Sequence, residues 1–536
     1  MRKLIMRGPR LLLLVVAFVL SGALVAGCGG GGGQESEGGN GGGGGDSANL
    51  TVGIDQEPDI LNGFIVGGDL AVTTDTTQGI LDKPYELQPD LSIAPQLAQG
   101  EPKVVSEDPL TIEYKLKKDL TFSDGEPLTS EDAKFTFDQV MKEDNNIISR
   151  EGFDKVESFE TPDDQTVRMV FSEPYAPWQD IISGSYAFIL PKHVYEDKNF
   201  NKDLSNEIVG SGPFKFKEWN KGQNLIVEKN ENYWGDEPAI DQITYRFIPD
   251  TNTLNTSLQS GEVSFINPPP DIGLKEKLEG YQGVTVDTKA GTVWEHVAFN
   301  LEKIDNLKIR QAVAYGINRK QILEEILPGQ VEPLDSVLVP EQAPYYEPAW
   351  EEYGFDPDRA SQLVEEAKSE GASTEITFST TSDNNLREQL QQVMQEQLKD
   401  VGLTVKIKNT AAPTFFGEWT PEGTFQMGEW AWLATPEPTL TSLFGADALP
   451  PEGQNYYRWE NEEATKLMKQ ADATLDEAER AEITREVQTM MAEEMPLIPL
   501  YQRPVYYGYE EGLKGPDVNP TLAGPYWNVG EWSLSQ

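Results

Sequence analysis

Cysteine and histidine are scarce: the chain of 536 residues contains one cysteine and two histidines. One thiol forms no intrachain disulfide, and these three side chains leave little for a zinc or copper site. The sequence also contains no G-x-S-x-G or H-E-x-x-H motif of the kind that marks an exported hydrolase. We therefore expect a protein that is not an enzyme and that has no catalytic residues, no metal site and no cofactor.

Cations are also few, because 43 Lys and Arg residues stand against 89 Asp and Glu residues and give a net charge of −46. Affinity for nucleic acid depends on clustered cations, so the composition argues against a DNA or RNA partner. The 38% hydrophobic and 10% aromatic residues still suffice for sizeable cores. The length suggests about three domains or two large lobes.

Long hydrophobic runs are missing beyond the N-terminus, where four cations precede the apolar residues 11–26. This run of 16 residues is shorter than the ~20 of a spanning helix and is typical of an export signal. It ends in L-V-A-G-C at residues 24–28, which resembles the bacterial lipobox. We expect a lipoprotein signal peptide at 1–27 and lipidation of Cys28. The alternative is a membrane anchor followed by an ordinary buried cysteine.

Glycine dominates the segment that follows, with 12 glycines among residues 29–45. Such a sequence is typical of a flexible coil, and its G-x-G matches carry no nucleotide-binding signal. We expect a linker at 28–49 between the lipidated cysteine and the folded body. These signals together predict an extracytoplasmic protein that a lipid anchors to the cell membrane, on its periplasmic or cell-surface side.

The remaining sequence alternates strand and helix patterns. Alternating apolar residues predict strands near the start, at 50–54 and 110–116, and helical spacing predicts a helix at 130–142. Farther along, a strand around 376–378, a helix at 386–401 and a strand at 403–407 follow one another. This order favours a βαβ unit and a largely parallel sheet. Thr474 and Glu477 have the spacing of a capping box and predict the start of a late helix.

Several segments resemble blocks of the extracellular solute-binding proteins of family 5, the oligopeptide-, dipeptide- and nickel-binding components of ABC importers. The most diagnostic is F-S-D-G-E-P-L-T-S-E-D-A at residues 122–133, which is close to the family's F-x-D-G-x-P-x-T-A-x-D-V. Further matches are V-G-S-G-P-F-K-F at 209–216, E-K-N-E-N-Y-W-G at 228–235, I-R-Q-A-V-A-Y-G-I-N-R at 309–319 and P-L-I-P-L-Y at 496–501. These blocks occur in the same order as in the family, and together the resemblance covers essentially all of residues 50–536.

The resemblance implies a fold, a domain arrangement and partners. The fold would be α/β with mixed sheets, in the two-lobed periplasmic-binding-protein class (type II, cluster C) with an extra domain. Its implied parts are lobe I at 50–84, 184–270 and 501–536, an additional domain II at 85–183, and lobe II (domain III) at 271–500. The solute would be enclosed by hinge closure and passed to ABC permease subunits in the membrane. The resemblance also implies a monomer.

One segment bears on the solute. In family members that bind peptides, an aspartate in G-W-x-A-D-Y-x-[DE]-P holds the α-amino group. Here W-A-W-L-A-T-P-E-P occupies residues 430–438. Trp432 and Glu437 match the motif, one residue is deleted, and Thr435 falls where the aspartate should be. A hydroxyl cannot neutralise a desolvated ammonium. Either Glu429 or Glu437 supplies the charge, or the solute lacks a free N-terminus.

The same segment is rich in tryptophan. Trp430 and Trp432, with the nearby Trp419, could stack on flat or sugar-like faces of a solute. Trp294 lies beside His296, which could face a cleft, and it joins the ligand-binding candidates. The alternative for each of these aromatic residues is ordinary core packing.

Two interpretations of function remain open, and both are importer binding proteins without chemistry of their own. The first is the capture of oligopeptide- or dipeptide-like solutes between the lobes. The second is the same fold binding an oligosaccharide, a metal chelate or a small cation, which the threonine at position 435 favours.

Overall fold

The computed structural model describes residues 48–535, except for Asp69, Ser205 and Asp383. Residues 47–536 form one compact unit, and the account below concerns it. The predicted signal peptide at 1–27, the lipidated Cys28 and nearly all of the predicted linker at 28–49 lie outside the described residues. They stay predictions.

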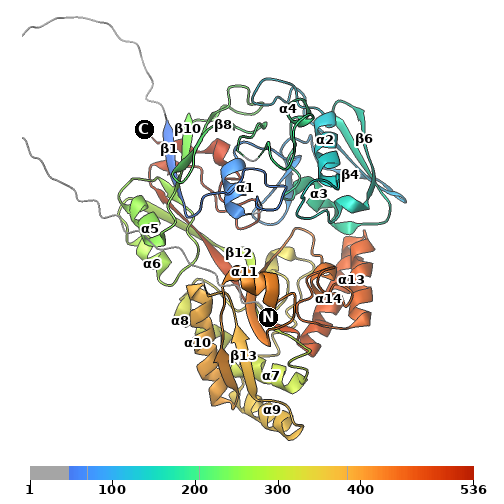
Figure 1. Ribbon diagram of the computed structural model, residues 1–536, viewed down its shortest axis with the longest axis vertical. Helices are drawn as coiled ribbons and strands as arrows, with labels where there is room; N and C mark the ends of the chain where they lie inside the picture. The colour runs from blue at the N-terminus through green and yellow to red at the C-terminus, as the bar shows by residue number, and fades with distance from the viewer. Residues whose placement is uncertain (1–47, 69, 205, 383, 536) are drawn as a thin grey trace, which may run out of the picture. The chain divides into compact units, whose positions relative to one another are not determined.

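The largest element is a ten-stranded mixed sheet (Figure 1). Its strands, in spatial order, are β14 (Thr404–Ile407), β13 (Glu375–Ser379), β15 (Met427–Leu433), β12 (Val284–Phe299), β16 (Leu497–Glu510), β11 (Phe265–Ile266), β1 (Asn49–Ile54), β10 (Gln242–Phe247), β9 (Asn224–Lys229) and β8 (Phe214–Asn220). The strand β13 pairs parallel with β14 and β15, and β1 pairs parallel with β10 and β11. The other pairs are antiparallel.

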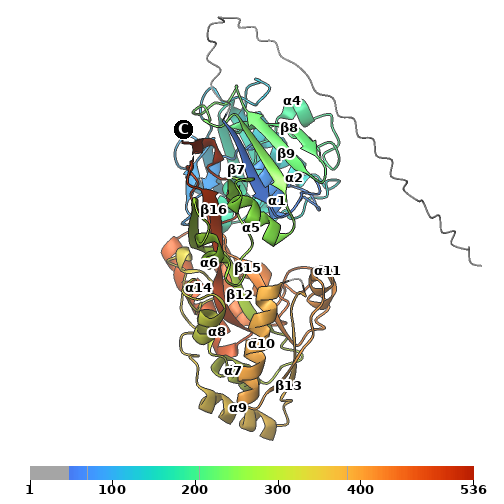
Figure 2. The ribbon, with the colours of Figure 1, turned by 90° about the vertical axis from the view of Figure 1, so that its left-hand side faces the viewer.

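The predicted βαβ unit is therefore confirmed, but the expectation of a largely parallel sheet is wrong. The reason is the long pair β12 and β16, which runs antiparallel from Val284 opposite Glu510 to Ala298 opposite Leu497. Figure 2 shows the two strands side by side. Because β12 also pairs antiparallel with β15, these strands join two groups of parallel strands with antiparallel contacts.

Three smaller sheets accompany the large one. An antiparallel sheet of four strands has the order β4 (Lys103–Glu107), β5 (Leu110–Lys115), β7 (Thr166–Phe171) and β6 (Val156–Asp163). Two short pairs are β2 (Tyr85–Leu87) with β3 (Ile93–Pro95) and β17 (Leu513–Lys514) with β18 (Ser533–Leu534). The helix α2 packs against β6 and β7 of the four-stranded sheet (Figure 1).

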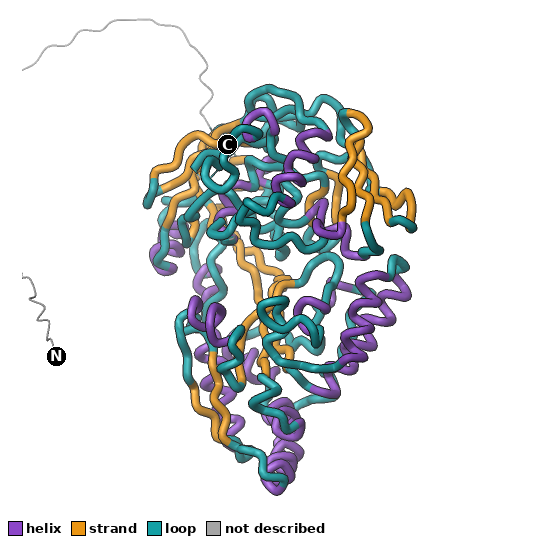
Figure 3. Tube along the Cα trace, turned by 45° about the vertical axis from the view of Figure 1, so that its right-hand side comes forward, coloured by secondary structure: helices purple, strands orange, loops and turns teal. Residues whose placement is uncertain are grey.

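The helices are mostly short, and the longer ones lie in the second half of the chain. Figure 3 draws the helices in purple among the strands and loops. They are α1 (Ala71–Thr77), α2 (Ser130–Met141), α3 (Gln179–Ser183), α4 (Lys192–Tyr195), α5 (Thr251–Gln259), α6 (Leu274–Glu279), α7 (Leu307–Gly316), α8 (Arg319–Ile326), α9 (Pro357–Ser369), α10 (Asn385–Asp400), α11 (Ala412–Thr414), α12 (Thr441–Phe444), α13 (Glu462–Ala473) and α14 (Glu477–Glu494). Single turns of 3-10 helix occupy Phe153–Lys155, Ala176–Trp178, Pro340–Gln342 and Val529–Glu531, and a π-helical turn occupies Phe415–Trp419.

Two large hydrophobic clusters form the interior. Core 1 packs β12, β13 and β15 against helices of the second half, and it includes Phe378, Leu390 and Trp430. Core 2 packs β1, β10 and the four-stranded sheet, and it includes Val52 and Ile112. A third, smaller cluster lies under α5 and α6. The chain thus builds two separate interiors, as its length suggested.

Most predicted elements are confirmed to within a residue or two. The strands expected at 50–54 and 403–407 are β1 and β14, and the helices expected at 130–142 and 386–401 are α2 and α10. A capping box opens α2, because Asp132 accepts a hydrogen bond from the backbone N–H of Thr129 at 2.9 Å. Local residues alone determined these starts, which is why the sequence sufficed.

The start of α14 differs from the prediction. Asp476 is the N-cap, and its side chain accepts a hydrogen bond from the backbone N–H of Glu479. Thr474 instead donates its hydroxyl proton to the carbonyl of Gln470 at 2.7 Å. A carboxylate three residues before Glu479 is as good a cap as a hydroxyl, so the spacing offered two starts and the later one is used.

Candidate functional site

A cavity of about 380 Å3 lies where elements of both cores meet. Phe64 and α1 line it from the side of core 2, and Val293 of β12 and Leu433 of β15 line it from the side of core 1. The loop 519–525 completes the wall. The volume is within the range of about 300–1,000 Å3 that is common for ligand pockets. This cavity is the candidate site.

A larger hollow of about 850 Å3 lies elsewhere, between residues 78–96, 213–239 and 526–531. No described residue of β12 or β15 lines this hollow, so its walls come from the side of core 2. A solute held between two lobes must touch both. We therefore place the site in the smaller cavity.

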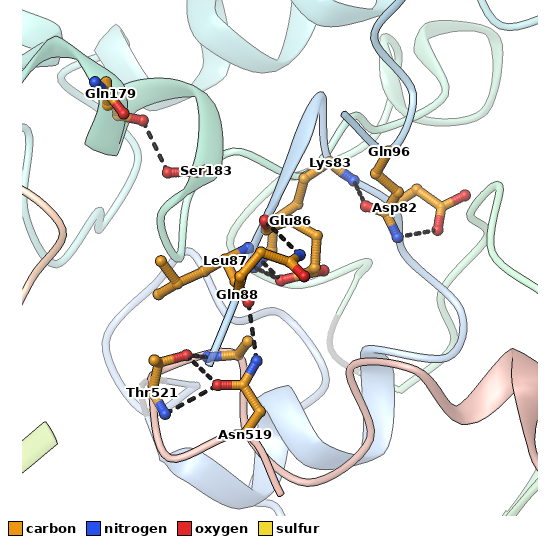
Figure 4. Close-up of polar contacts among 11 residues, drawn as sticks. Asp82, Lys83, Glu86, Leu87, Gln88, Gln96, Gln179, Ser183, Asn519 and Thr521 are labelled. Carbon is orange, nitrogen blue, oxygen red and sulfur yellow. Dashed lines mark hydrogen bonds and ion pairs between the residues drawn. The ribbon is translucent and has the colours of Figure 1, made fainter. Parts of the chain in front are cut away.

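The loop 519–525 is fixed to the body by a polar network (Figure 4). The side-chain amide of Asn519 donates to the carbonyl oxygen of Leu87 at 2.9 Å. Its carbonyl oxygen accepts from the backbone N–H and the hydroxyl of Thr521, at 3.0 and 2.6 Å. Beside it, the buried ammonium of Lys83 lies 3.4 Å from the carboxylate of Glu86. This wall of the cavity is therefore positioned before any solute arrives.

The strands β12 and β15 present two different faces at the cavity. Val293 pairs with Leu433, and Trp294 pairs with Trp432. Because successive side chains of a strand point to opposite faces, the cavity-lining pair and the tryptophan pair lie on opposite sides of the sheet. The predicted aromatic residues thus share one face, while Glu429 and the cavity-lining residues share the other.

The aromatic face belongs to core 1. Trp430 and Trp294 are 1% and 2% exposed. Trp432 is half-buried and stacks on Tyr456 with ring centroids 6.0 Å apart. Its indole N–H donates to the hydroxyl oxygen of Tyr457 at 2.7 Å, which lies 2.7 Å from Nε2 of His296. Burial lowers the pKa of His296 to about 3, so its imidazole is neutral. These contacts match core packing.

The opposite face carries a buried charge cluster around Glu295. Its carboxylate, 1% exposed, accepts from Nε of Arg387 at 3.2 Å and from Nε of Arg503 at 2.6 Å. The two guanidinium groups lower the pKa of Glu295 against the desolvation that raises it. Glu429 lies in the same cluster, and neither of its carboxyl oxygens has a hydrogen-bond partner among the described residues. Burial, with the charge of Glu295, raises the pKa of Glu429 well above its usual value.

We expect Glu429→Gln to raise the free energy of unfolding by about 1–3 kcal/mol at neutral pH. Folding raises the pKa of this carboxyl. Below its unfolded pKa of 4.5 the carboxyl is protonated in both the folded and the unfolded protein and does not destabilise the fold. As the pH rises from there toward the folded pKa, ionisation favours the unfolded protein, and stability is lost. The gain should therefore disappear near about pH 4. Urea titrations of wild type and variant at several pH values measure it, and a gain that does not depend on pH contradicts the prediction.

Glu437 is the other acid that could have met an ammonium group, and its carboxylate is already paired. It accepts from Nη2 of Arg480 at 2.6 Å, from the hydroxyl of Tyr345 at 3.0 Å and from the amide of Gln179 at 3.3 Å. Thr435 donates its hydroxyl proton to the carbonyl oxygen of Glu437 at 2.8 Å, which holds the turn together.

None of the six predicted ligand-binding residues is among the described residues that line the cavity. They are Trp294, Glu429, Trp430, Trp432, Thr435 and Glu437. The first four lie on the paired strands β12 and β15, where the pair of Trp294 and Trp432 is next to the pair of Val293 and Leu433. Sequence reasoning missed Asp75, the one charged residue among the lining residues. No motif marks it, because it sits in a short run of threonines.

Two further observations concern metals and membranes. Among residues 48–535 as described, no three His, Cys, Asp or Glu side chains are grouped so that they could hold a metal ion. Within the same residues, no helix has the length and apolar character needed to cross a membrane.

Comparison with known proteins identifies relatives over nearly the whole chain. The family described as bacterial extracellular solute-binding proteins, family 5 Middle, matches residues 92–448. The oligopeptide-binding protein AppA of Bacillus subtilis (strain 168) is 26% identical over 515 residues, which cover 91% of this chain and 92% of AppA.

Solved structures give the same result for the fold. The periplasmic EDTA-binding protein EppA superposes with a TM-score of 0.83 at 23% identity, covering 91% of this chain and 97% of EppA. AppA from Bacillus subtilis in complex with a nonapeptide superposes with a TM-score of 0.76 at 25% identity, covering 91% of this chain and 99% of AppA. The predicted two-lobed α/β class is confirmed.

Proposed function

Because the chain belongs to the bacterial extracellular solute-binding proteins of family 5, we propose that it captures peptides in the 380 Å3 cavity and delivers them to the permease of an ABC importer. It is an extracytoplasmic binding protein of transport and not an enzyme. The observation that carries the proposal is the cavity itself, because elements of both cores line it and closure around a solute would bury the solute.

The character of the lining supports a peptide. Most lining side chains are apolar or aromatic, among them Phe64, Tyr186 and Phe188, while Asn519 and Thr521 supply polar atoms. Apolar walls accept varied side chains, and a few polar groups orient the backbone. AppA, bound to a nonapeptide in its crystal structure, shares this fold across 91% of the chain.

The finer points of organisation are part of the same proposal. We infer that Cys28 carries the lipid anchor, that residues 1–27 are removed, and that the glycine-rich linker reaches to residue 49. The domain boundaries stay as the family resemblance implies them, with domain II at 85–183 and lobe II at 271–500. The chain would act as a monomer beside its permease.

Native mass spectrometry of the full chain as purified tests the proposal, because a carrier can retain its cargo. We expect a bound mass that dissociates and fragments as a peptide. Added peptide should raise the free energy of unfolding by about 2.7 kcal/mol at a hundredfold excess over the dissociation constant. Conversion of the bound molecule during incubation would contradict the proposal, as would a retained sugar or chelate with no response to peptides.

A second candidate is a non-peptide solute in the same cavity. Thr435 stands where the family motif of peptide binders has an aspartate, and the carboxylate of Glu437 is engaged by Arg480. EppA, named as an EDTA-binding protein, has the same fold with a TM-score of 0.83. Thermal-shift measurements with oligosaccharides and metal chelates beside peptides separate the two candidates.

A further inference from the structure

The cavity contains one charged residue, Asp75 on α1. Asp75 is half-buried and faces the cavity from the side of core 2. No described residue donates a hydrogen bond to its carboxylate or forms an ion pair with it, although 26 ion pairs occur elsewhere in the described chain. An acid without a cation in a mostly apolar cavity is costly unless a ligand supplies the positive charge.

A second group points to the same place. The amide of Gln78, one helical turn after Asp75, is 5% exposed, and neither its oxygen nor its nitrogen has a hydrogen-bond partner among the described residues. Gln78 borders the larger hollow, on the other side of the cavity wall from Asp75. Buried amides are normally hydrogen-bonded, so this one requires an explanation. Gln78 and Asp75 lie on the same side of α1, because residues three apart are neighbours on a helix.

Both groups converge on Gly524 in the loop 519–525. Gly524 adopts a φ of 71°, in the left-handed region that favours glycine. A Cβ atom at this position would lie 3.1 Å from Oδ1 of Asp75 and 4.0 Å from Oε1 of Gln78. The side chains of Asp75 and Gln78 therefore approach the backbone of Gly524 closely, at the edge of the cavity, and a larger residue at position 524 would crowd Asp75.

The surroundings of Asp75 are anionic or neutral. Asp55, after β1, is a second half-buried acid without an ion pair among the described residues, and burial raises its pKa. The hydroxyl groups of Tyr245, Tyr507 and Tyr526 also interact with Asp75, and burial raises the pKa of each of these tyrosines. Tyr186 lines the same cavity. No cation is among the groups that shift the pKa of Asp75.

We propose that Asp75, with Gln78 beside it, forms a subsite that binds a protonated primary amine of the solute. An alkylammonium carries three N–H donors, and the two oxygens can accept from it. The apolar lining beyond the subsite then accommodates the rest of the solute. The inference rests on the proposed function, and it supplies the counter-charge that position 435 lacks.

Two kinds of amine have this chemistry, the α-amino group of a peptide and the side-chain ammonium of lysine. Burial, together with the charge of Asp55, raises the pKa of Asp75 to about 8, and a bound cation requires the ionised form. Affinity for a lysine ammonium, with its pKa of about 10.4, should rise about 50-fold from about pH 6 to about pH 8 and then level off. Affinity for an α-amino group, with its pKa of about 8, should peak near about pH 8 and fall on both sides.

Calorimetric titration of the full chain with three pools of apolar pentapeptides tests the subsite. The pools have free amino termini, acetylated amino termini, or acetylated termini with one lysine. In Asp75→Asn, affinity for amine-bearing pools should fall about 10- to 100-fold, the loss of a charged hydrogen-bonded contact. Binding of the acetylated, lysine-free pool should not change. The exposed Asp59 gives the matched control, and Asp59→Asn should behave as wild type.

Measurements of stability distinguish a role in solute binding from a purely structural role for Asp75 and Gln78. Because Asp75 is largely neutral at pH 7 and Gln78 lacks partners, neither Asp75→Asn nor Gln78→Leu should lower the thermal midpoint. Both should nevertheless weaken amine binding, Gln78→Leu by about 3- to 10-fold. A variant that loses affinity only in proportion to lost stability contradicts the inference.

The outcomes also separate the two proposals. If peptides bind the wild type and Asp75→Asn binds every pool equally well, the subsite is refuted and peptide capture stands. If hexylamine binds the wild type but no peptide pool does, and if Asp75→Asn no longer binds hexylamine, the subsite is supported and peptide capture is refuted. If neither peptides nor hexylamine bind, both are overturned.

Discussion

Replacement of Glu295 by glutamine is expected to lower the free energy of unfolding by about 3–5 kcal/mol at neutral pH. Glu295 is 1% exposed and forms ion pairs with both Arg387 and Arg503. Removing its charge leaves two guanidinium groups with no counter-charge in a desolvated site. Because folding lowers the pKa of Glu295, its contribution is present above the unfolded pKa of 4.5 and is lost as the pH falls through the folded value. The loss in the variant should therefore shrink in acid.

The neighbouring Glu429 makes a sharper form of this prediction possible. Because burial raises the pKa of Glu429 well above its usual value, we expect Glu429→Gln to be stabilising in the wild type. In the Glu295→Gln background, Glu429 becomes the nearest acid to Arg387 and Arg503, which already lower its pKa. It should then ionise and recover part of the loss, so that adding Glu429→Gln becomes destabilising. A double-mutant cycle by urea unfolding measures this change of sign, and additive effects contradict it.

The surface pair of Glu113 and Arg168 provides the control. One carboxylate oxygen of Glu113 accepts from both Nε and Nη2 of Arg168, at 3.2 and 2.9 Å. Unlike the buried cluster, this pair is partly exposed, with 20% of the Glu113 side chain and 38% of the Arg168 side chain accessible. Exposed ion pairs contribute about 0–1 kcal/mol. Glu113→Gln should therefore cost much less than Glu295→Gln. An equal cost would show that loss of the interior counter-charge is not the cause.

Elements of the fold that depend on local patterns could be predicted from the sequence. The helix α10 shows its buried face in Leu386, Leu390 and Met394, and its neighbours β13 and β14 show alternation, so the unit was visible. The antiparallel pairing of β12 with β16 could not be predicted from the sequence. It joins residues about 200 positions apart, and no local pattern identifies the partner of a strand. The same limit explains why a largely parallel sheet was expected.

The candidate site was predictable only in part. The motif around Trp432 led to β15, whose next residue, Leu433, lines the cavity. The sequence does not show which face of β15 meets the solute, because both faces carry large or charged side chains. Most of the predicted ligand-binding residues therefore came from the aromatic face. The opposite wall comes from α1 and from the loop 519–525, far away in the sequence. Asp75, between threonines of low helix propensity, gave neither a helical nor a functional signal.

The second large effect is expected for Trp430→Ala, with a loss of about 3–5 kcal/mol in the free energy of unfolding. Trp430 is 1% exposed, and the ring centroids of His296, Phe425 and Tyr457 lie 4.9, 5.5 and 5.6 Å from its own. Truncation removes a large buried surface and leaves a void that these rings cannot fill without moving. Chemical unfolding measures the loss. Solute affinity, measured where the variant is still folded, should stay within about threefold of wild type, because this face points away from the cavity.

Two further variants distinguish packing from recognition at this position. Trp430→Phe keeps most of the ring and removes an indole N–H that has no partner, so it should recover most of the stability. The half-buried Trp419 packs at the edge of core 1, and Trp419→Ala should cost well under half as much as Trp430→Ala. If Trp430→Ala instead keeps its stability and loses the solute, the tryptophan face is the binding face. The cavity lined by Val293 and Leu433 would then not be the site, since one strand cannot present residues 430 and 433 to the same side.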